Sequence, residues 1–237
     1  MTNDASKLPE TAAALFQSYG LPVSPEKIIT SGSLLKTYFA ANGLSGTRCA
    51  VLGPGDSRRY VELAGGRTVE LHQDFDVLVI GDESGYPFLE TVDRILGALF
   101  AKIERRERLR LILPNPDLIF PKADRGYGFA SGSIALMFEA AIALKFPNRP
   151  DLRFVRLGKP HGAIFDEAQR RAGTPHMVMI GDQLETDIRG ANRFGIDSVL
   201  VDGGLAAAAA DSASQDSRPT YRLRTLVPIR QRDAGPP

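Results

Sequence analysis

The sequence is poor in the residues that build cross-linked or membrane-embedded proteins. Among its 237 residues there is one cysteine, Cys49, and no tryptophan. A single thiol excludes an internal disulfide and a cysteine-based zinc cluster. No apolar run approaches the roughly 20 residues needed to cross a bilayer. Lys and Arg number 29 against 28 Asp and Glu, so the net charge of +1 gives no electrostatic reason to expect binding to nucleic acid.

What is present is an ordinary globular composition. Hydrophobic residues make up 43% of the chain and charged residues 24%. That content suffices for a sizeable core in one large domain or two small ones. We therefore expect a cytoplasmic protein with no membrane partner and no nucleic-acid partner.

Short apolar runs rich in Val, Ile and Leu alternate with segments of helical spacing, and the runs predict strands buried on both faces of a parallel sheet. The predicted strands are Arg48–Leu52, Phe75–Ile80, Leu109–Leu113, Phe154–Leu157, Met177–Ile180 and Ser198–Val201. The predicted helices are Leu8–Tyr19, Ser33–Ala41, Pro87–Lys102, Gly132–Lys145, Gly162–Ala172 and Glu185–Phe194. This alternation predicts an α/β fold with a doubly wound, Rossmann-like parallel-sheet core.

The middle of the chain predicts an inserted domain. Residues 46–150 carry three strands and at least two helices of their own, and a Pro- and Asn-containing stretch, Phe146–Pro150, closes them. We expect an α/β cap there, with residues 1–45 and 151–227 forming the two parts of the core. Tyr221–Val227 is expected to return as a final strand, and residues 228–237 to form a disordered tail.

An apolar strand that runs into Gly181-Asp182, with Asp187 five residues on, is the strongest local signal. Ligands of open α/β sheets bind at the carboxyl ends of strands, and two carboxylates held there suit Mg²⁺. The alternative is that Asp182 merely ends a strand and Asp187 caps a helix. This segment alone does not separate the two interpretations.

Two further segments place polar groups next to predicted elements. Lys159 follows a strand between Gly158 and Pro160, where a fixed ammonium suits phosphate oxygens; the alternative is a solvated surface lysine. Thr2 and Asn3 precede a helix and could hold a phosphoryl group, or could simply cap that helix.

In this order and context the three segments resemble the haloacid-dehalogenase superfamily of Mg²⁺-dependent phosphatases, and most closely its subclass IIA, which includes p-nitrophenyl-phosphatase-like and pyridoxal-phosphate-phosphatase-like enzymes. Thr2-Asn3 looks like motif II, Gly158-Lys159-Pro160 like motif III, and Gly181-Asp182 with Thr186-Asp187 like motif IV. Ile28–Gly32 and Pro114–Asp117 also match stretches typical of this branch.

The resemblance implies a hydrolase that acts on a small phosphorylated metabolite. Asp182 would ligate Mg²⁺, and Asp187 would orient the metal site directly or through water. Lys159 would bind the phosphoryl oxygens and the nucleophile, and Thr2 and Asn3 would hold the transferring phosphoryl. Caps of this branch often contribute to dimers, so a homodimer is possible under the resemblance.

The sequence lacks the Asp-x-Asp-Gly motif from which this family forms its aspartyl-phosphate intermediate. Its only Asp-x-Asp, Asp74-Phe75-Asp76, precedes its apolar run and would lie at the wrong end of a strand. Asp202 follows a strand but has no second Asp. We expect an N-terminally truncated, inactive phosphatase; the alternative is a non-catalytic module that binds phosphorylated ligands or a partner.

Two glycine-rich stretches are expected to be structural. Gly53-Pro54-Gly55-Asp56 is not a dinucleotide fingerprint, because Arg58 stands where the third glycine belongs, and this argues against a nicotinamide-dependent oxidoreductase. Gly126–Gly132 is expected to be a turn before a helix.

Overall fold

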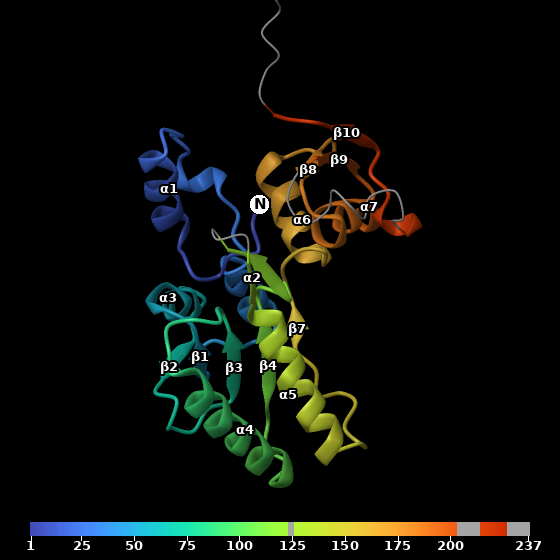
Figure 1. Cartoon of the computed structure of the whole chain (residues 1–237). Coiled ribbons are helices and arrows are strands. Elements are labelled where there is room, and N and C mark those ends of the chain that lie inside the picture. Colours follow the sequence, from blue (N-terminus) through green and yellow to red (C-terminus); the bar gives the residue numbers. More distant parts are fainter. Residues whose placement is uncertain (123–125, 203–213, 227–237) are drawn as a thin grey trace, which may run out of the picture. The chain divides into compact units, whose positions relative to one another are not determined.

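The computed structural model describes residues 1–122, 126–202 and 214–226. The chain forms two compact units, Met1–Gly173 and Thr174–Pro237 (Figure 1). Among the described residues no helix is both long and apolar enough to span a membrane.

The first unit is built on a five-stranded sheet in the order β2-β1-β3-β4-β7, parallel throughout. The strands are β1 (Arg48–Leu52), β2 (Arg67–Val69), β3 (Val77–Ile80), β4 (Arg110–Leu113) and β7 (Val155–Arg156). Four predicted strands are thereby confirmed: β1 has its predicted bounds, and β3, β4 and β7 are shorter than predicted. β7 lies beyond residue 150 and pairs with β4, while the domain boundaries near residues 45 and 150 stay a prediction.

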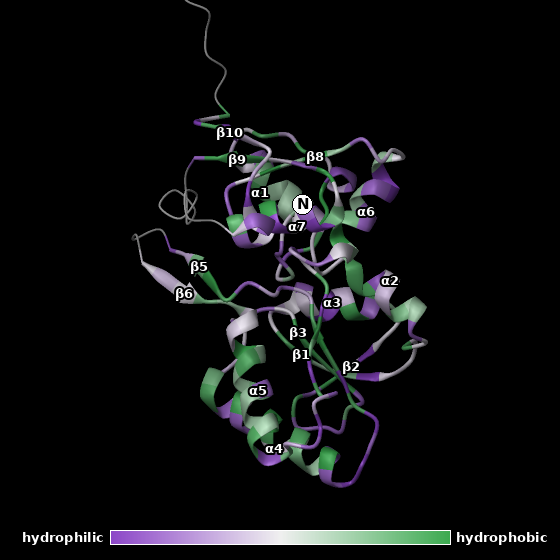
Figure 2. Cartoon of the chain, turned by 90° about the vertical axis from the view of Figure 1, so that its right-hand side faces the viewer, coloured by the Kyte–Doolittle hydropathy of each residue, from purple (hydrophilic) through white to green (hydrophobic). Residues whose placement is uncertain are grey.

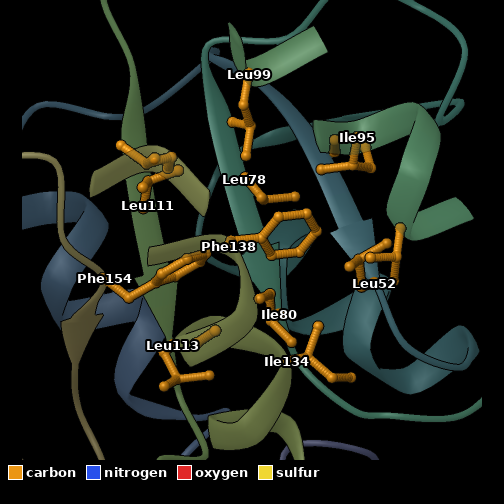
Figure 3. Close-up of a cluster of buried hydrophobic side chains, with 14 of the residues drawn as sticks. Leu52, Leu78, Ile80, Ile95, Leu99, Leu111, Leu113, Ile134, Phe138 and Phe154 are labelled. Atoms are coloured by element: carbon orange, nitrogen blue, oxygen red, sulfur yellow. The ribbon is translucent and has the colours of Figure 1, made fainter. Parts of the chain in front are cut away.

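Both faces of this sheet are buried, as its continuous apolar strands predicted. Leu52, Leu78, Ile80, Leu111 and Leu113 point to one face, where they pack with side chains of α4 (Phe88–Glu104) and α5 (Ser131–Lys145) (Figure 3). The intervening residues of β1, β3 and β4 point to the other face and are also buried. α5 is apolar around most of its circumference (Figure 2), yet Leu144 is 86% exposed.

The remaining elements of the first unit are α1 (Pro9–Ser18), a 3₁₀ turn (Pro25–Lys27), α2 (Leu34–Ala41), α3 (Gly55–Leu63), α6 (Gly162–Ala172), and a hairpin of β5 (Ile119–Pro121) and β6 (Tyr127–Phe129). The hairpin corrects the expectation of a turn over Gly126–Gly132, since Tyr127–Phe129 is a strand. A larger residue could not replace Gly128 without a clash, because the Phe120 ring lies about 2.5 Å from where a Cβ would be.

Helix α3, which the sequence did not reveal, holds the segment that follows Asn3. The Asp56 carboxylate accepts hydrogen bonds from Leu8 N–H (2.9 Å) and Thr11 Oγ1 (2.7 Å). Ser57 Oγ donates to the Ala5 carbonyl (2.7 Å), and the Tyr60 hydroxyl donates to the Lys7 carbonyl (2.5 Å). Three side chains of one helix therefore fix the path of residues 5–11.

The second unit contains a parallel sheet in the order β10-β9-β8. Its elements are β8 (Val178–Gly181), a π-helical turn (Leu184–Ile188), α7 (Arg189–Phe194), β9 (Asp197–Val201), a 3₁₀ turn (Gln215–Ser217) and β10 (Tyr221–Leu223). The predicted helix over Glu185–Phe194 is thus a π turn followed by a short α-helix. The final strand is confirmed over Tyr221–Leu223, and the predicted tail over 228–237 lies outside the described residues.

Within the part of the chain that the structure describes, β8 pairs with β9 alone. Two of its side chains, Val178 and Ile180, are 52% and 47% exposed. An apolar strand of this kind with one unpaired edge offers backbone N–H and C=O groups to a further strand.

Within α6 the Glu167 carboxylate accepts hydrogen bonds from Arg170 and Arg171 at 2.7 Å each. Arg171 also donates to the carbonyls of Glu26 and Ile28, which ties α6 to that segment. The hydrogen bond from Arg170 lowers the pKa of Glu167 to about 2, and Arg171 contributes in the same direction. The ionised form of Glu167 is therefore favoured by folding.

We expect Glu167→Gln to lower the free energy of unfolding by about 1–2 kcal/mol at pH 7. The contribution of Glu167 is fully present above its unfolded pKa near 4.5 and is lost as the pH falls towards about 2. The difference between wild type and variant should therefore vanish between those two pH values. Urea unfolding at pH 7, 5, 3 and 2 measures it.

Glu90→Gln serves as the control, because Glu90 forms an i,i+4 pair with Arg94 on the surface of α4 and is 70% exposed. An exposed pair of this type contributes about 0.5 kcal/mol or less. A Glu167→Gln difference that persists unchanged at pH 2 would show that Glu167 acts through packing and not through its charge.

Candidate active site

The Thr2–Asn3 turn is held to the chain at Thr30 by a single parallel bridge. Thr2 N–H donates to the Ile29 carbonyl and Ser31 N–H donates to the Thr2 carbonyl, both at 2.9 Å. The Thr2 hydroxyl accepts a hydrogen bond from Asp4 N–H (3.2 Å), and Ser31 Oγ donates to the Asn3 carbonyl (2.7 Å). The backbone around the Thr2 hydroxyl is therefore set by the Ile29–Ser31 segment.

The Asn3 carboxamide binds Lys159, 156 residues away in the sequence. Lys159 N–H donates to Asn3 Oδ1 at 2.7 Å, and Asn3 Nδ2 donates to the Lys159 carbonyl at 2.9 Å. Asn3 Nδ2 also donates to Asp117 Oδ1 at 2.8 Å. Asn3 is 4% exposed and Lys159 9% exposed. One buried amide thus joins the turn resembling motif II to the turn resembling motif III.

Gly158 makes this approach possible. A Cβ at Gly158 would lie 2.5 Å from Asn3 Oδ1 and 2.7 Å from the Pro114 carbonyl. Gly158 N–H donates to that same carbonyl at 2.9 Å, which continues the pairing of β7 with β4 past the strand ends. A side chain at this position would separate Asn3 from the Lys159 peptide, and the Lys159–Pro160 peptide bond that follows is cis.

In the second unit, Asp187 folds back onto the end of β8. Its Oδ2 accepts hydrogen bonds from the backbone N–H groups of Asp182 and Gln183, both at 3.2 Å, and Asp187 is 3% exposed. Gly181 leaves room for it, since a Cβ there would overlap the Asp187 carboxylate. Asp187 therefore holds the loop that carries Asp182, while Asp182 lies at the carboxyl end of the strand.

The structure brings the predicted residues together in two sets. Thr2, Asn3 and Lys159 meet in the first unit, and Asp182 and Asp187 meet in the second. Among the described residues, no three His, Cys, Asp or Glu side chains gather in a way that could hold a metal ion. The Asp182 carboxylate has the hard oxygen atoms that Mg²⁺ prefers, so it fits as one ligand of the ion. The remaining ligands would have to come from groups other than these side chains.

Glu83 adds a half-buried carboxyl group just past the carboxyl end of β3. Burial raises the pKa of Glu83, and the charge of Asp82 raises it further. Ser131 Oγ, in the first turn of α5, donates to it at 3.3 Å. This edge of the sheet thus holds a group that takes up a proton more readily than a surface glutamate does.

Asp74 and Asp76 precede β3 and lie at its amino end, as their order in the sequence predicts. Asp74 pairs with Lys102 (2.6 Å) and Arg48 (2.7 Å), and Asp76 pairs with Arg48 (2.8 Å). The hydrogen bond from Lys102 lowers the pKa of Asp74, and that from Arg48 lowers the pKa of Asp76. Both carboxylates are committed to ion pairs at the opposite edge from Lys159.

Asp117 is the residue that sequence reasoning missed as part of this arrangement. It follows β4 just as Lys159 follows β7, and the two strands are neighbours. Carboxyl ends of adjacent parallel strands meet at one sheet edge, so this position was the available signal. The contact to Asn3 itself depends on the fold.

Comparison with known proteins identifies the family to which the chain belongs. A family model described as haloacid dehalogenase-like hydrolase matches residues 1–67, and one described as HAD-hydrolase-like matches residues 156–228. The chain is a haloacid dehalogenase-like hydrolase. The two matches contain every residue of the two sets described above and leave out most of the predicted cap.

Relatives of this hydrolase are named as phosphatases. An acid sugar phosphatase from Staphylococcus haemolyticus is 25% identical over 95% of this chain and 80% of its own length. A possible sugar phosphatase of the HAD superfamily from Cytophaga hutchinsonii has a similar structure, with a TM-score of 0.79 and 27% identity over 96% of this chain and 81% of that one.

The glycerol phosphate phosphatase of Mycobacterium tuberculosis, in complex with magnesium, gives a TM-score of 0.78 at 26% identity. The match covers 93% of this hydrolase but only 63% of the mycobacterial chain. The Rossmann-like α/β fold predicted from the sequence agrees with these structures.

Proposed function

We propose that this hydrolase has the binding machinery of a Mg²⁺-dependent phosphatase for a small phosphorylated metabolite. The proposal rests on the two hydrogen bonds between the Asn3 carboxamide and the backbone N–H and C=O of Lys159. These bonds join a cationic residue to the Thr2 turn. A phosphoryl group needs positive charge and hydrogen-bond donors around its oxygens, and little covalent chemistry from the protein.

Each residue has a distinct task in this proposal. The Lys159 ammonium binds phosphoryl oxygens. The Thr2 hydroxyl and the Asn3 backbone N–H, which has no acceptor among the described residues, face the same group. Asp182 ligates Mg²⁺, and Asp187 orients Asp182 by holding its backbone N–H. When bound, Mg²⁺ supplies charge that neutralises the phosphoryl oxygens.

The proposed substrates are small sugar or polyol phosphates. Relatives named as acid sugar phosphatase and glycerol phosphate phosphatase support this class. Formation of an aspartyl phosphate requires a carboxylate nucleophile placed in line with the phosphorus, and the sequence has no Asp-x-Asp-Gly. We therefore assign binding of substrate and metal to this chain, with turnover dependent on an added nucleophile. A homodimer stays a prediction from the family resemblance.

The second candidate is a non-catalytic module that binds phosphorylated ligands. The absence of an Asp-x-Asp-Gly motif supports this module as much as it supports a phosphatase that needs an added nucleophile. The two differ in what an added nucleophile does. Turnover that appears when an Asp-x-Asp-Gly strand is supplied supports the phosphatase. A chain that binds phosphate but stays inactive in that form is the binding module.

Binding of Mg²⁺ and inorganic phosphate tests the proposal on residues 1–237. We expect amide resonances of residues 181–187 to shift with Mg²⁺ and those of Thr2, Asn3 and Lys159 to shift with phosphate in nuclear magnetic resonance titrations. Asp182→Asn should weaken Mg²⁺ binding by about tenfold or more, because a carboxylate ligand becomes a neutral amide.

The matched control is Asp197→Asn, which removes an exposed carboxylate from the start of β9 in the same unit. Its Mg²⁺ affinity should equal that of wild type. Equal losses in both variants would mean that Mg²⁺ responds only to net charge, and would remove Asp182 from the metal site.

A further inference from the structure

Asp117 contacts the site through the Asn3 amide. Its Oδ1 accepts a hydrogen bond from Asn3 Nδ2 at 2.8 Å, and the other bond of Nδ2 goes to the Lys159 carbonyl at 2.9 Å. Asn3 Oδ1 meanwhile accepts from Lys159 N–H at 2.7 Å. The three residues come from different segments of the first unit, and the Asn3 amide takes part in all three of these hydrogen bonds.

Only one orientation of the Asn3 amide satisfies these contacts. Rotated by 180°, its oxygen would face the Asp117 carboxylate and the Lys159 carbonyl, which are both acceptors, and its NH₂ would face the Lys159 N–H. A carboxylate is the partner that most strongly demands a donor, and its hydrogen bonds are about twice as strong as neutral ones. Asp117 therefore selects the amide orientation that holds Lys159.

Asp117 is itself fixed by the start of α5 and by its own loop. Its backbone N–H binds Asn115 Oδ1 at 3.0 Å, and its carbonyl accepts from Gly132 N–H at 2.9 Å. Gly132 packs against the carbonyls of Pro116 and Asp117 with no space for a Cβ. The carboxylate consequently reaches Asn3 from a rigid position at the end of β4.

We propose that Asp117 is a positioning residue: it orients the Asn3 amide, which holds the Lys159 peptide so that the Lys159 ammonium meets a phosphate oxygen. This inference rests on the proposed function for its last step. Its first step, the setting of the amide by Asp117, is a property of the protein alone and is measured without any ligand.

The first measurement is the spectroscopic signature of the amide. In wild type both Asn3 Nδ2 protons are hydrogen-bonded, so we expect slowly exchanging side-chain NH₂ resonances and a protected Lys159 amide. Asp117→Asn keeps the shape and removes the charge. We expect it to shift the Asn3 NH₂ and Lys159 N–H resonances and to speed their exchange, with the rest of the spectrum unchanged.

The second measurement is inorganic phosphate binding, followed at the Lys159 resonances. Asp117→Asn should weaken it by about tenfold, as loss of a charge-assisted hydrogen bond does. Asn3→Ala should weaken it at least as much, and the double variant no further, because both act through the same amide. Additive losses would show that Asp117 acts by another route and would overturn the proposal.

Asp82→Asn is the matched control, since Asp82 lies at the same sheet edge and its carboxylate accepts hydrogen bonds from Ser84 alone within the described ranges. It should leave the Asn3 resonances as in wild type. Unchanged Asn3 and Lys159 resonances in Asp117→Asn overturn the proposal directly, with or without phosphate. If wild-type Lys159 does not respond to phosphate, the proposed function fails, and the ligand-free resonances still decide the role of Asp117.

Discussion

We expect residues 1–237 to hydrolyse p-nitrophenyl phosphate with Mg²⁺ at least about 10⁴-fold more slowly than a form extended at its N-terminus by an apolar strand ending in Asp-x-Asp-Gly. Loss of a nucleophile removes the step in which the phosphoryl group is transferred, while binding groups such as Lys159 are kept. Steady-state rates for the two forms, at equal Mg²⁺, measure the ratio.

Among the described strands β8 is bonded to β9 alone and Val178 and Ile180 are half-exposed, so β8 has one edge open to a further strand. The control is the extended form with its first Asp changed to Asn, which should fall back to the rate of residues 1–237. If the extended form is active and residues 1–237 reach a rate within tenfold of it, the nucleophile lies inside these 237 residues. Asp74 and Asp76 would still be poor candidates, because Arg48 and Lys102 hold them.

The second large effect is expected at Gly181. Gly181→Ala places a methyl group where the Asp187 carboxylate lies, so the carboxylate must leave the N–H groups of Asp182 and Gln183. A buried carboxylate without its donors and a crowded strand end cost about 2–4 kcal/mol of unfolding free energy. Mg²⁺ affinity should fall as well, since the Asp182 loop loses its anchor. Denaturant unfolding and Mg²⁺ titration give the two values.

Gly97→Ala is the control for this substitution. Gly97 lies within α4 with nothing near the position of a Cβ, and alanine there should stabilise the helix by about 0.5–1 kcal/mol. If Gly181→Ala were as harmless as Gly97→Ala, the contact of Asp187 with the end of β8 would not contribute to stability, and its role in orienting Asp182 would need another explanation.

The sequence predicted the sheet well because burial on both faces leaves a continuous apolar run. β1, β3 and β4 were found for this reason, and α6 was placed at its observed bounds, Gly162–Ala172. α3 was missed because its residues, from Gly55 to Leu63, are mostly polar and begin with a glycine typical of loops. β2, β5 and β6 are three residues each and carry too few apolar side chains to be distinguished from turns.

Local spacing decided how much of the site could be predicted. Asp182 and Asp187 are five residues apart and meet within one loop, so their proximity is visible in the sequence. Asn3 and Lys159 were named as separate phosphate-binding candidates, but the pairing of their amide and peptide groups spans 156 residues and depends on the Thr2–Thr30 bridge and on β7. Asp117 could not be assigned to Asn3 without that geometry.

The hydrogen bonds from α3 to residues 5–11 limit how the predicted cap could be exchanged for another. A chimera that replaced residues 46–150 would remove Asp56, Ser57 and Tyr60 together, and with them the partners of Ala5, Lys7 and Leu8. The loop beside Thr2 and Asn3 would then have no support from the transplanted domain. A replacement domain intended to change substrate preference must therefore keep α3 of this chain, or supply three side chains equivalent to Asp56, Ser57 and Tyr60, along with the new loops.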